Sequence, residues 1–238
     1  MSLPKKISPN PLVTSTVELR FVSGLGDGQL LSRIYPTFSQ EFPKLINGQI
    51  PTQIKKLQPQ FQFAPDHIMS NDEYSISFGN SAISFENIIS YPLWDNYFAF
   101  IKKQLIKLFE LKLFVRIDRV GIRYASILSG VTIPSQALKY IPAISIDGYN
   151  NEEFELFRTN LKKSNYNFHL QVARNAIVTK QGISKSGLYI DIDASVTMPL
   201  QPDLSAILIY LENLHMEQKA MFFEIIRPEY LNTLNPEY

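Results

Sequence analysis

The most constraining feature of the chain is a pair of short runs, 74–78 and 81–85, in which apolar and polar residues alternate. Alternation with a period of two is typical of a β-strand that buries one face, because successive side chains point to opposite sides of the strand. Gly79 and Asn80 stand between the two runs, and a glycine can adopt positive φ without a Cβ clash. The sequence therefore predicts a β-hairpin with its turn at Gly79 and Asn80.

The same two kinds of periodicity occur along the rest of the chain. Alternating segments predict strands over 13–21, 114–128, 168–179 and 188–196. Apolar residues at helical spacing predict helices over 29–42, 90–110 and 204–226. Shorter strands are expected in the connecting region, around 143–146 and 152–158. A strand pair followed by a long helix thus occurs twice.

The order of these elements predicts an α+β fold with a mostly antiparallel sheet and two long amphipathic helices. We expect residues 13–238 to form a single domain, in which two similar halves, 13–129 and 143–238, pack together. Residues 1–12 contain three prolines and no periodicity, so we expect an extended lead-in there.

The composition excludes several kinds of chemistry. The 238 residues include no cysteine, so disulfide frameworks, thiolate zinc sites, iron–sulfur clusters and cysteine nucleophiles are ruled out. A net charge of +1 gives no overall field that would attract nucleic acid or an anionic membrane. The chain has no signal-like start, and its longest apolar run, Ala206–Leu211, is too short to span a bilayer. We therefore expect a soluble, cytoplasmic protein without membrane contact.

No motif in the sequence specifies a reaction. Gly24, Gly26 and Gly28 lie between a predicted strand and a predicted helix, but their spacing is not that of a dinucleotide-binding loop. The three histidines are far apart and lack a second ligand type at metal spacing, and no nucleophile motif occurs among the serines. We predict neither a cofactor nor a metal, and whether the protein is an enzyme stays open.

Two arginines of the strand 114–128 are candidate ligand-binding residues. A period of two places Arg119 and Arg123 on the same face, on either side of Gly121. Because Gly121 has no side chain, the gap between the two guanidinium groups could admit an anion. This pattern predicts an anion-binding role for the two arginines.

Two further predicted strands carry acidic and histidine side chains. Asp191 and Asp193 share one face of the strand 188–196, and His169 lies on the polar face of the strand 168–179. If these strands are neighbours, the three side chains and an arginine converge, which favours an acid–base or cation site. The same pattern is typical of a solvated or salt-bridged polar face of an antiparallel sheet. Both interpretations stay open.

Charged residues form two blocks of opposite sign. Residues 102–123 contain seven lysines and arginines against two acidic residues, which is a net charge of +5. The last fifty residues contain eight acidic residues against two basic ones, which is a net charge of −6. Such blocks favour pairing within the chain or across a homodimer. A nucleic-acid partner is not expected, because no base-stacking motif accompanies the basic block.

Four motifs, spread over nearly the whole chain, carry a family resemblance. They are PLVTSTVELRF at 11–21, RIDRVGIRYASIL at 116–128, DID at 191–193 and LHMEQKAMFFEII at 214–226. In this order they resemble a sporadically distributed, uncharacterised prokaryotic family of proteins of about this length. Members usually follow the FF-x-x-I block with a threonine, whereas Arg227 and Pro228 stand here. The resemblance implies no catalytic residues, and its patchy distribution implies an accessory system such as defence or a mobile element.

Two functions are therefore expected from the sequence. The first is a non-catalytic binding or interaction module with a protein partner or a second copy, because apolar stripes and opposed charge blocks are present while catalytic motifs are not. The alternative is an enzyme or receptor for a small anionic, phosphorylated ligand. In that alternative Arg119 and Arg123 hold the ligand, with Asp191, Asp193 or His169 available for proton transfer or metal coordination.

Overall fold

The structure, a computed structural model, describes residues 2–26, 28–142, 147, 154–180 and 182–238. The strands of the described residues are β1 (Leu12–Ser23), β2 (Lys44–Asn47), β3 (His67–Ser70), β4 (Tyr74–Gly79), β5 (Ala82–Asn87), β6 (Phe114–Ser129), β7 (Leu156–Lys163), β8 (Tyr166–Lys180) and β9 (Ile183–Leu200). The α-helices are α1 (Gln29–Phe38), α2 (Thr52–Leu57), α3 (Trp94–Glu110), α4 (Leu204–Ile225) and α5 (Pro228–Asn232). Among the described residues, no helix combines the length and apolarity needed to cross a membrane.

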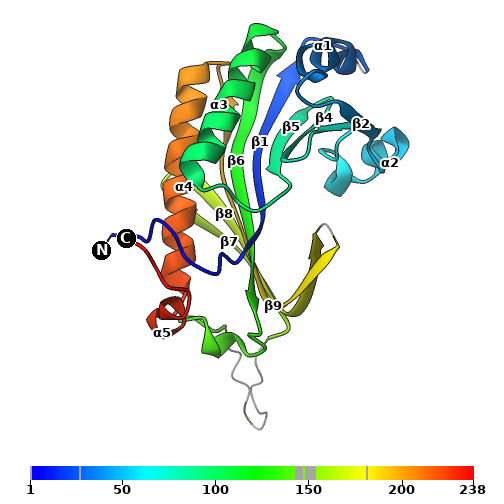
Figure 1. The fold of residues 1–238 in the computed structure, drawn as a ribbon. Helices are drawn as coiled ribbons and strands as arrows, with labels where there is room; N and C mark the ends of the chain where they lie inside the picture. Colours follow the sequence, from blue (N-terminus) through cyan, green and yellow to red (C-terminus); the bar gives the residue numbers. More distant parts are fainter. Residues whose placement is uncertain (1, 27, 143–146, 148–153, 181) are drawn as a thin grey trace. The chain divides into compact units, whose positions relative to one another are not determined.

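These strands form one antiparallel sheet in the order β2-β3-β4-β5-β1-β6-β9-β8-β7 (Figure 1). Strand β1 lies between β5 and β6, and β9 lies between β6 and β8, so the sheet does not follow the sequence order. The three strands that carry the predicted site residues, β6, β9 and β8, are therefore consecutive in the sheet. Strand β7 is the last strand at one end of the order, and β2 is the last at the other.

The predicted fold class is wrong. Among the described residues, strands make up 41% and helices 29%, and three helices, α1, α3 and α4, have seven or more residues where two long helices were expected. The sheet is larger than expected for two reasons. Strand β9, expected over 188–196, has 18 residues, far above the usual five or six, and the short strands β2 and β3 lie where no strand was expected. Residues 183–186 at the start of β9 are exposed on both faces, so they have no apolar periodicity for a sequence pattern to detect.

Most individual elements were predicted correctly. The strands expected over 13–21 and 114–128 and the helix expected over 204–226 are confirmed as β1, β6 and α4. The strand expected around 143–146 lies outside the described residues. The predicted hairpin is confirmed as β4 and β5.

The turn of this hairpin lies one residue later than predicted, at Asn80 and Ser81. Gly79 is consequently the last residue of β4 and needs no positive φ there. A Cβ atom at Gly79 would lie 3.0 Å from Asp66 Oδ2 and 3.3 Å from the Ala64 carbonyl oxygen. Glycine is therefore favoured at this position by the close approach of the neighbouring loop.

Two compact units divide the chain, and each combines segments that are distant in sequence. The central unit consists of Ser15–Ile122 and Ser195–Asn213. The terminal unit consists of Met1–Thr14, Arg123–Ala194 and Leu214–Tyr238. These boundaries differ from the predicted halves, 13–129 and 143–238, whose similarity stays a prediction.

In the central unit, α1 and α3 contribute buried apolar side chains to a core that they share with β1, β4 and β5. Its fully or almost fully buried members include Val17, Leu19, Ile34, Phe38, Ile76, Phe85, Ile101 and Leu105. Tyr97 of α3 is also fully buried. Its hydroxyl group lies 3.0 Å from the Ser15 carbonyl oxygen and 2.8 Å from that of Phe85, which links α3 to β1 and β5.

We expect Tyr97→Phe to lower the free energy of unfolding by about 1–2 kcal/mol, because it leaves two buried carbonyl groups without this hydroxyl donor. Urea denaturation followed by circular dichroism measures the loss. Tyr35→Phe is the matched control, because Tyr35 is 41% exposed, and its expected effect is below about 0.5 kcal/mol. Equal effects of the two substitutions would show that the Tyr97 hydroxyl does not stabilise the core.

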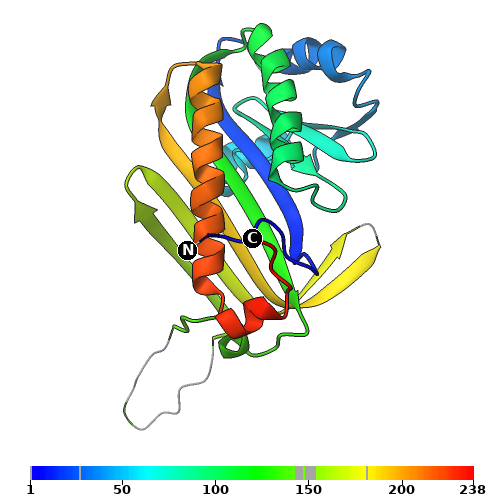
Figure 2. The ribbon, with the colours of Figure 1, turned by 60° about the vertical axis from the view of Figure 1, so that its left-hand side comes forward.

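In the terminal unit, β8, β9 and the second half of α4 share another core. Its buried side chains include Phe168, Leu170, Val172, Leu188, Ile190 and Leu214. The predicted lead-in is bonded to the end of the chain, and the two termini lie side by side in Figures 1 and 2. The amide of Lys5 donates to the Glu237 carbonyl oxygen at 2.6 Å, and the amide of Ser8 donates to that of Leu234 at 2.6 Å.

Candidate functional site

Arg123 and Asp191, two of the predicted site residues, are bonded to each other. Arg123 Nε donates to Asp191 Oδ1 at 3.0 Å and Nη2 donates to Oδ2 at 2.5 Å, while the Tyr189 hydroxyl donates to Oδ2 at 3.1 Å. The Asp191 side chain is only 6% exposed. Hydrogen bonds to Asp191 raise the pKa of the Arg123 guanidinium above its ordinary value. The carboxylate is thus neutralised by a partner on the adjacent strand.

Arg119 has a different partner. Its Nη1 donates to Glu18 Oε1 at 2.7 Å, and Arg20 Nε donates to the same oxygen at 2.7 Å. A Cβ atom at Gly121 would lie 2.2 Å from Arg119 Nη1. The guanidinium group of Arg119 therefore occupies the space over Gly121, where an anion was expected to bind.

The remaining predicted residues are His169 and Asp193. His169 Nδ1 lies 2.9 Å from Asn160 Oδ1, which bridges the exposed faces of β8 and β7. Asp193 is partly buried, and its charge adds to the effects that raise the pKa of Arg123. The structure therefore joins Arg123 to Asp191, with Asp193 near enough to act on Arg123, and gives Arg119 and His169 other partners.

A groove of about 810 Å³ lies in the terminal unit, and the sequence patterns gave no sign of it. It is bordered by the second half of α4, by α5, by the N-terminal segment and by the end of β7. Its apolar lining includes Leu3, Leu161, Phe168, Met221, Phe223, Ile225 and Leu231.

The charged residues around this groove are mostly paired. Lys163 Nζ lies 2.7 Å from Glu217 Oε2, and Lys139 Nζ lies 3.6 Å from Glu224 Oε1. Lys162 also borders the groove and is exposed. Two of the three lysines at the groove are therefore neutralised by α4, and Lys162 leaves a positive charge at the end of β7.

Strand β7, which borders the groove, ends the sheet, so among the described strands only β8 pairs with it. The Arg174 amide donates to the Glu155 carbonyl oxygen, and the register continues from Leu156 opposite Ala173. In an antiparallel pair, residues exchange hydrogen bonds at every second position. The backbone groups of Arg158, Asn160 and Lys162 consequently point away from β8, toward the open edge.

The two faces of β7 differ in character. Phe157, Thr159 and Leu161 lie opposite residues of β8 that are buried, namely Val172, Leu170 and Phe168. Arg158, Asn160 and Lys162 lie opposite Gln171, His169 and Asn167, on the polar face. Strand β7 carries Arg158, Lys162 and Lys163 and no acidic residue, so its open edge is positively charged.

Sequence reasoning missed this edge. A short strand was expected around 152–158, whereas β7 begins at Leu156 and continues to Lys163. The signal in the sequence is the alternation of Phe157, Thr159 and Leu161 with polar residues, which is weak because threonine interrupts the apolar side. Nothing in a single sequence indicates that a strand lies at the end of a sheet.

Comparisons with known proteins add no family assignment: no protein-family model matches the chain, and the curated proteins searched include no match.

Proposed function

We propose that this protein is a non-catalytic binding module that takes an extended segment of a partner protein as an additional strand on β7. The observation that carries the proposal is the open edge of β7 beside an apolar groove of about 810 Å³. The resemblance to a sporadically distributed prokaryotic family supports an accessory role in the cytoplasm. The accessory role and the cytoplasmic location are both parts of this proposal.

The backbone of β7 supplies the affinity in this proposal. An edge strand presents amide and carbonyl groups that a second chain can pair with, and peptide-binding domains use such edges to add a strand. The outward groups of Arg158, Asn160 and Lys162 are spaced two residues apart, as a new antiparallel or parallel strand requires. The added strand then continues the sheet without a change in β7.

The side chains of β7 select the partner. Alternate residues of an added strand lie on opposite faces of the sheet, so one set faces the groove beside Leu161 and the other lies beside Arg158 and Lys162. The first set is expected to be apolar and the second acidic. The partner segment is therefore a strand in which apolar residues alternate with aspartate or glutamate.

The same charges disfavour pairing of β7 with a second copy of itself. Two copies of β7 would bring the arginine and lysine side chains of both strands together, and like charges opposite each other on a sheet are destabilising. Positive charge on an edge strand is also a common protection against self-association. A different, acidic chain is thus favoured over a homodimer at this edge.

The alternative function, an enzyme or receptor for a small anionic ligand at Arg119 and Arg123, is less well supported. Each of these guanidinium groups is already bonded to a carboxylate, Glu18 or Asp191. An incoming anion would have to displace that carboxylate, and the displaced Asp191 would lose its partner in a nearly buried position.

Labelled synthetic peptides test the proposal by fluorescence anisotropy. The probe is an eight-residue peptide of alternating valine and glutamate, and the comparison peptide has lysine in place of glutamate. We expect the glutamate peptide to bind at least about tenfold more tightly, and N-methylation of alternate backbone nitrogens to abolish binding.

A charge-reversed protein provides the matched control. Arg158→Glu combined with Lys162→Glu changes exposed side chains only, so the thermal unfolding curve should stay unchanged. We expect this variant to prefer the lysine peptide. Absence of binding by either peptide to the unmodified protein, or an unaltered preference in the charge-reversed variant, would contradict the proposal.

A further inference from the structure

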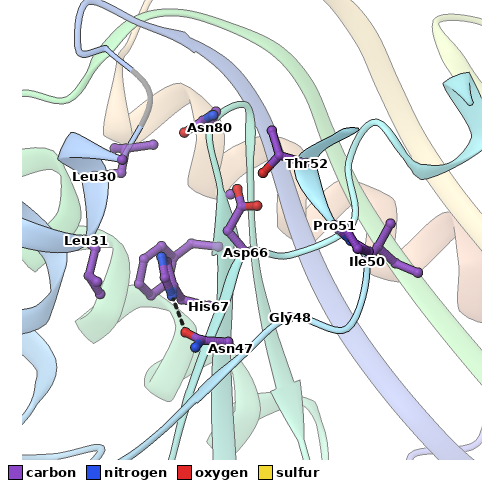
Figure 3. Close-up of a pocket in the computed structure, with 13 residues that line it drawn as sticks. Leu30, Leu31, Asn47, Gly48, Ile50, Pro51, Thr52, Asp66, His67 and Asn80 are labelled. Atoms are coloured by element: carbon purple, nitrogen blue, oxygen red, sulfur yellow. Dashed lines mark hydrogen bonds between the residues drawn. The ribbon is translucent and has the colours of Figure 1, made fainter. Parts of the chain in front are cut away.

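The central unit contains a separate pocket of about 400 Å³, close to the lower end of the range for small-molecule sites. It is bordered by the first residues of α1 and α2, by the end of β2, by the start of β3 and by the end of β4 (Figure 3). No residue of the β7 edge or its groove takes part in it. What this pocket binds is therefore a question independent of the proposed function.

Backbone packing fixes the walls of the pocket. The Gly48 amide donates to the Asp66 carbonyl oxygen at 2.7 Å, and the Asp66 amide donates to that of Phe78 at 2.9 Å. A Cβ atom at Gly48 would lie 1.9 Å from the Pro65 carbonyl oxygen, so the segment after β2 can approach this loop only with a glycine. The pocket is preformed by these contacts.

Asp66 provides a hydrogen-bond acceptor in the pocket. Its Oδ1 accepts from Lys55 Nζ at 2.6 Å, and Lys55 Nζ also donates to the Ala64 carbonyl oxygen at 2.6 Å. The Lys55 side chain is only 10% exposed, so it neutralises Asp66 and is held in place. Within the described residues, no donor is bonded to Oδ2. This oxygen is directed over Gly79, at the pocket.

His67 adds a second acceptor. Its Nδ1 lies 3.2 Å from Asn47 Oδ1, and because an amide oxygen accepts, Nδ1 is the donor in this contact. In a ring that carries a single proton, Nε2 is then an acceptor. The ring also lies against Phe78, with 5.5 Å between the ring centroids. Asp66 and His67 therefore offer acceptors to a ligand, beside the amide groups of Asn47 and Asn80 and the hydroxyl group of Thr52.

Apolar side chains line the pocket on two sides. In Figure 3, Leu30 and Leu31 of α1 lie on one side, Ile50 and Pro51 lie on the other, and Asp66 and His67 lie between them. Among the described residues that line the pocket there is no lysine or arginine. Two apolar walls with polar groups between them fit a flat, neutral molecule whose edge carries N–H donors, and they offer no cation to a phosphate group.

We propose that this pocket binds a neutral amino-substituted heterocycle of the purine type, with its N–H edge directed at Asp66 and its two faces against the apolar walls. A guanine ring has a ring N–H and an amino group side by side, and a carboxylate accepts from such a pair. The Oδ2 atom of Asp66 accepts from this edge while Oδ1 stays bonded to Lys55.

Isothermal titration calorimetry with guanosine tests this inference on the full chain. We expect inosine, which lacks the amino group, to bind at least about tenfold more weakly, and guanosine monophosphate to bind no more tightly than guanosine. Stronger binding of glucose than of guanosine would assign the pocket to a sugar and overturn the inference. Absence of heat and of thermal stabilisation with millimolar guanosine would also overturn it.

Three variants locate the binding. Asp66→Asn and Leu31→Trp, which fills the pocket from α1, should each weaken guanosine binding at least about tenfold. Asp72→Asn is the matched control, because Asp72 is exposed, pairs with Lys44 at 2.8 Å and does not border the pocket, and it should leave the affinity unchanged. If the Asp66→Asn variant does not fold, the Leu31→Trp variant alone tests whether guanosine binds in this pocket. Undiminished binding by folded Leu31→Trp would contradict the inference, whereas the peptide experiment on β7 would be unaffected.

Discussion

Replacing Arg123 with methionine is expected to lower the free energy of unfolding by about 2–4 kcal/mol at neutral pH. The substitution preserves the apolar stem but removes the guanidinium group that donates to both oxygens of Asp191. Asp191 is nearly buried. Without Arg123, the Tyr189 hydroxyl is the one donor described above that still bonds to the Asp191 carboxylate. The expected cost is below that of a fully buried pair, because Arg123 itself is half exposed.

Urea denaturation of a double-mutant cycle measures this effect. Asp191→Asn combined with Arg123→Met should recover part of the stability, because no unpaired charge remains. Arg158→Met is the matched control, since Arg158 is exposed and bonds to the neutral Gln171, and its expected cost is below about 0.5 kcal/mol. A loss below about 1 kcal/mol for Arg123→Met would mean that Arg123 is not needed by Asp191. That result would revive the anion-binding alternative.

The predictable part of the fold is the part with one buried face. β1 and most of β5 alternate in sequence because they alternate in burial, and α3 and α4 have apolar residues at helical spacing because one side of each helix is buried. Strand β6 is an exception, since both of its faces are buried over residues 119–122 and 124–128. Residues 183–186 of β9 are exposed on both faces, so they have no such signal, whereas β8 was expected over 168–179 and extends over nearly the same residues. The helix-to-strand balance was misjudged where β9 extends beyond 188–196 and at the short strands β2 and β3.

Sequence periodicity also predicted which polar side chains share a face, but not their partners. The alternation placed Asp191 and Asp193 on one strand face, with an arginine expected to converge on them if the strands 168–179 and 188–196 are neighbours, and in the structure Arg123 bonds to Asp191. That Arg119 bonds to Glu18 could not be predicted, because it depends on β1 and β6 being adjacent although 101 positions separate the two residues. The two-residue period of a strand indicates the face to which each side chain points, whereas the partner of a side chain depends on which strands are adjacent in the sheet.

The glycines show the same limit. Gly79 was expected as a turn residue because of its freedom of φ, and Gly121 was expected to leave a gap for an anion because it has no side chain. In the structure both are close-approach positions, filled by Asp66 and by Arg119. The pocket around Asp66 and the groove beside β7 likewise join segments that are far apart in the chain, so no local spacing could indicate them.

His215 is expected to make the protein lose stability as the pH falls. This histidine of α4 is buried, and its Nδ1 lies 3.2 Å from the Tyr124 hydroxyl oxygen. Burial, reinforced by the positive charge of Lys219, lowers the pKa of His215 from 6.5 to about 3. The folded protein therefore holds a neutral ring over a pH range in which the unfolded chain binds a proton.

The direction of the pH effect follows from this difference in bound protons. Above the unfolded pKa of 6.5 both states are neutral and stability is unaffected, whereas between 6.5 and about 3 only the unfolded state is protonated. Each pH unit in this window costs about 1.4 kcal/mol, so about 2.7 kcal/mol should be lost by about pH 4.5 relative to pH 8. Acidic side chains contribute mainly below this point, since their ordinary pKa values are near or below 4.5.

Denaturant unfolding at a series of pH values, compared between two glutamine variants, isolates this contribution. His215→Gln should flatten the decline between pH 6.5 and about 4.5, because the group that binds the proton on unfolding is gone. His169→Gln removes an exposed histidine that bonds to Asn160 and should keep the decline of the unmodified protein. An equally steep decline in His215→Gln would mean that His215 takes up a proton in the folded state, which would require its ring to reach water between β6 and α4.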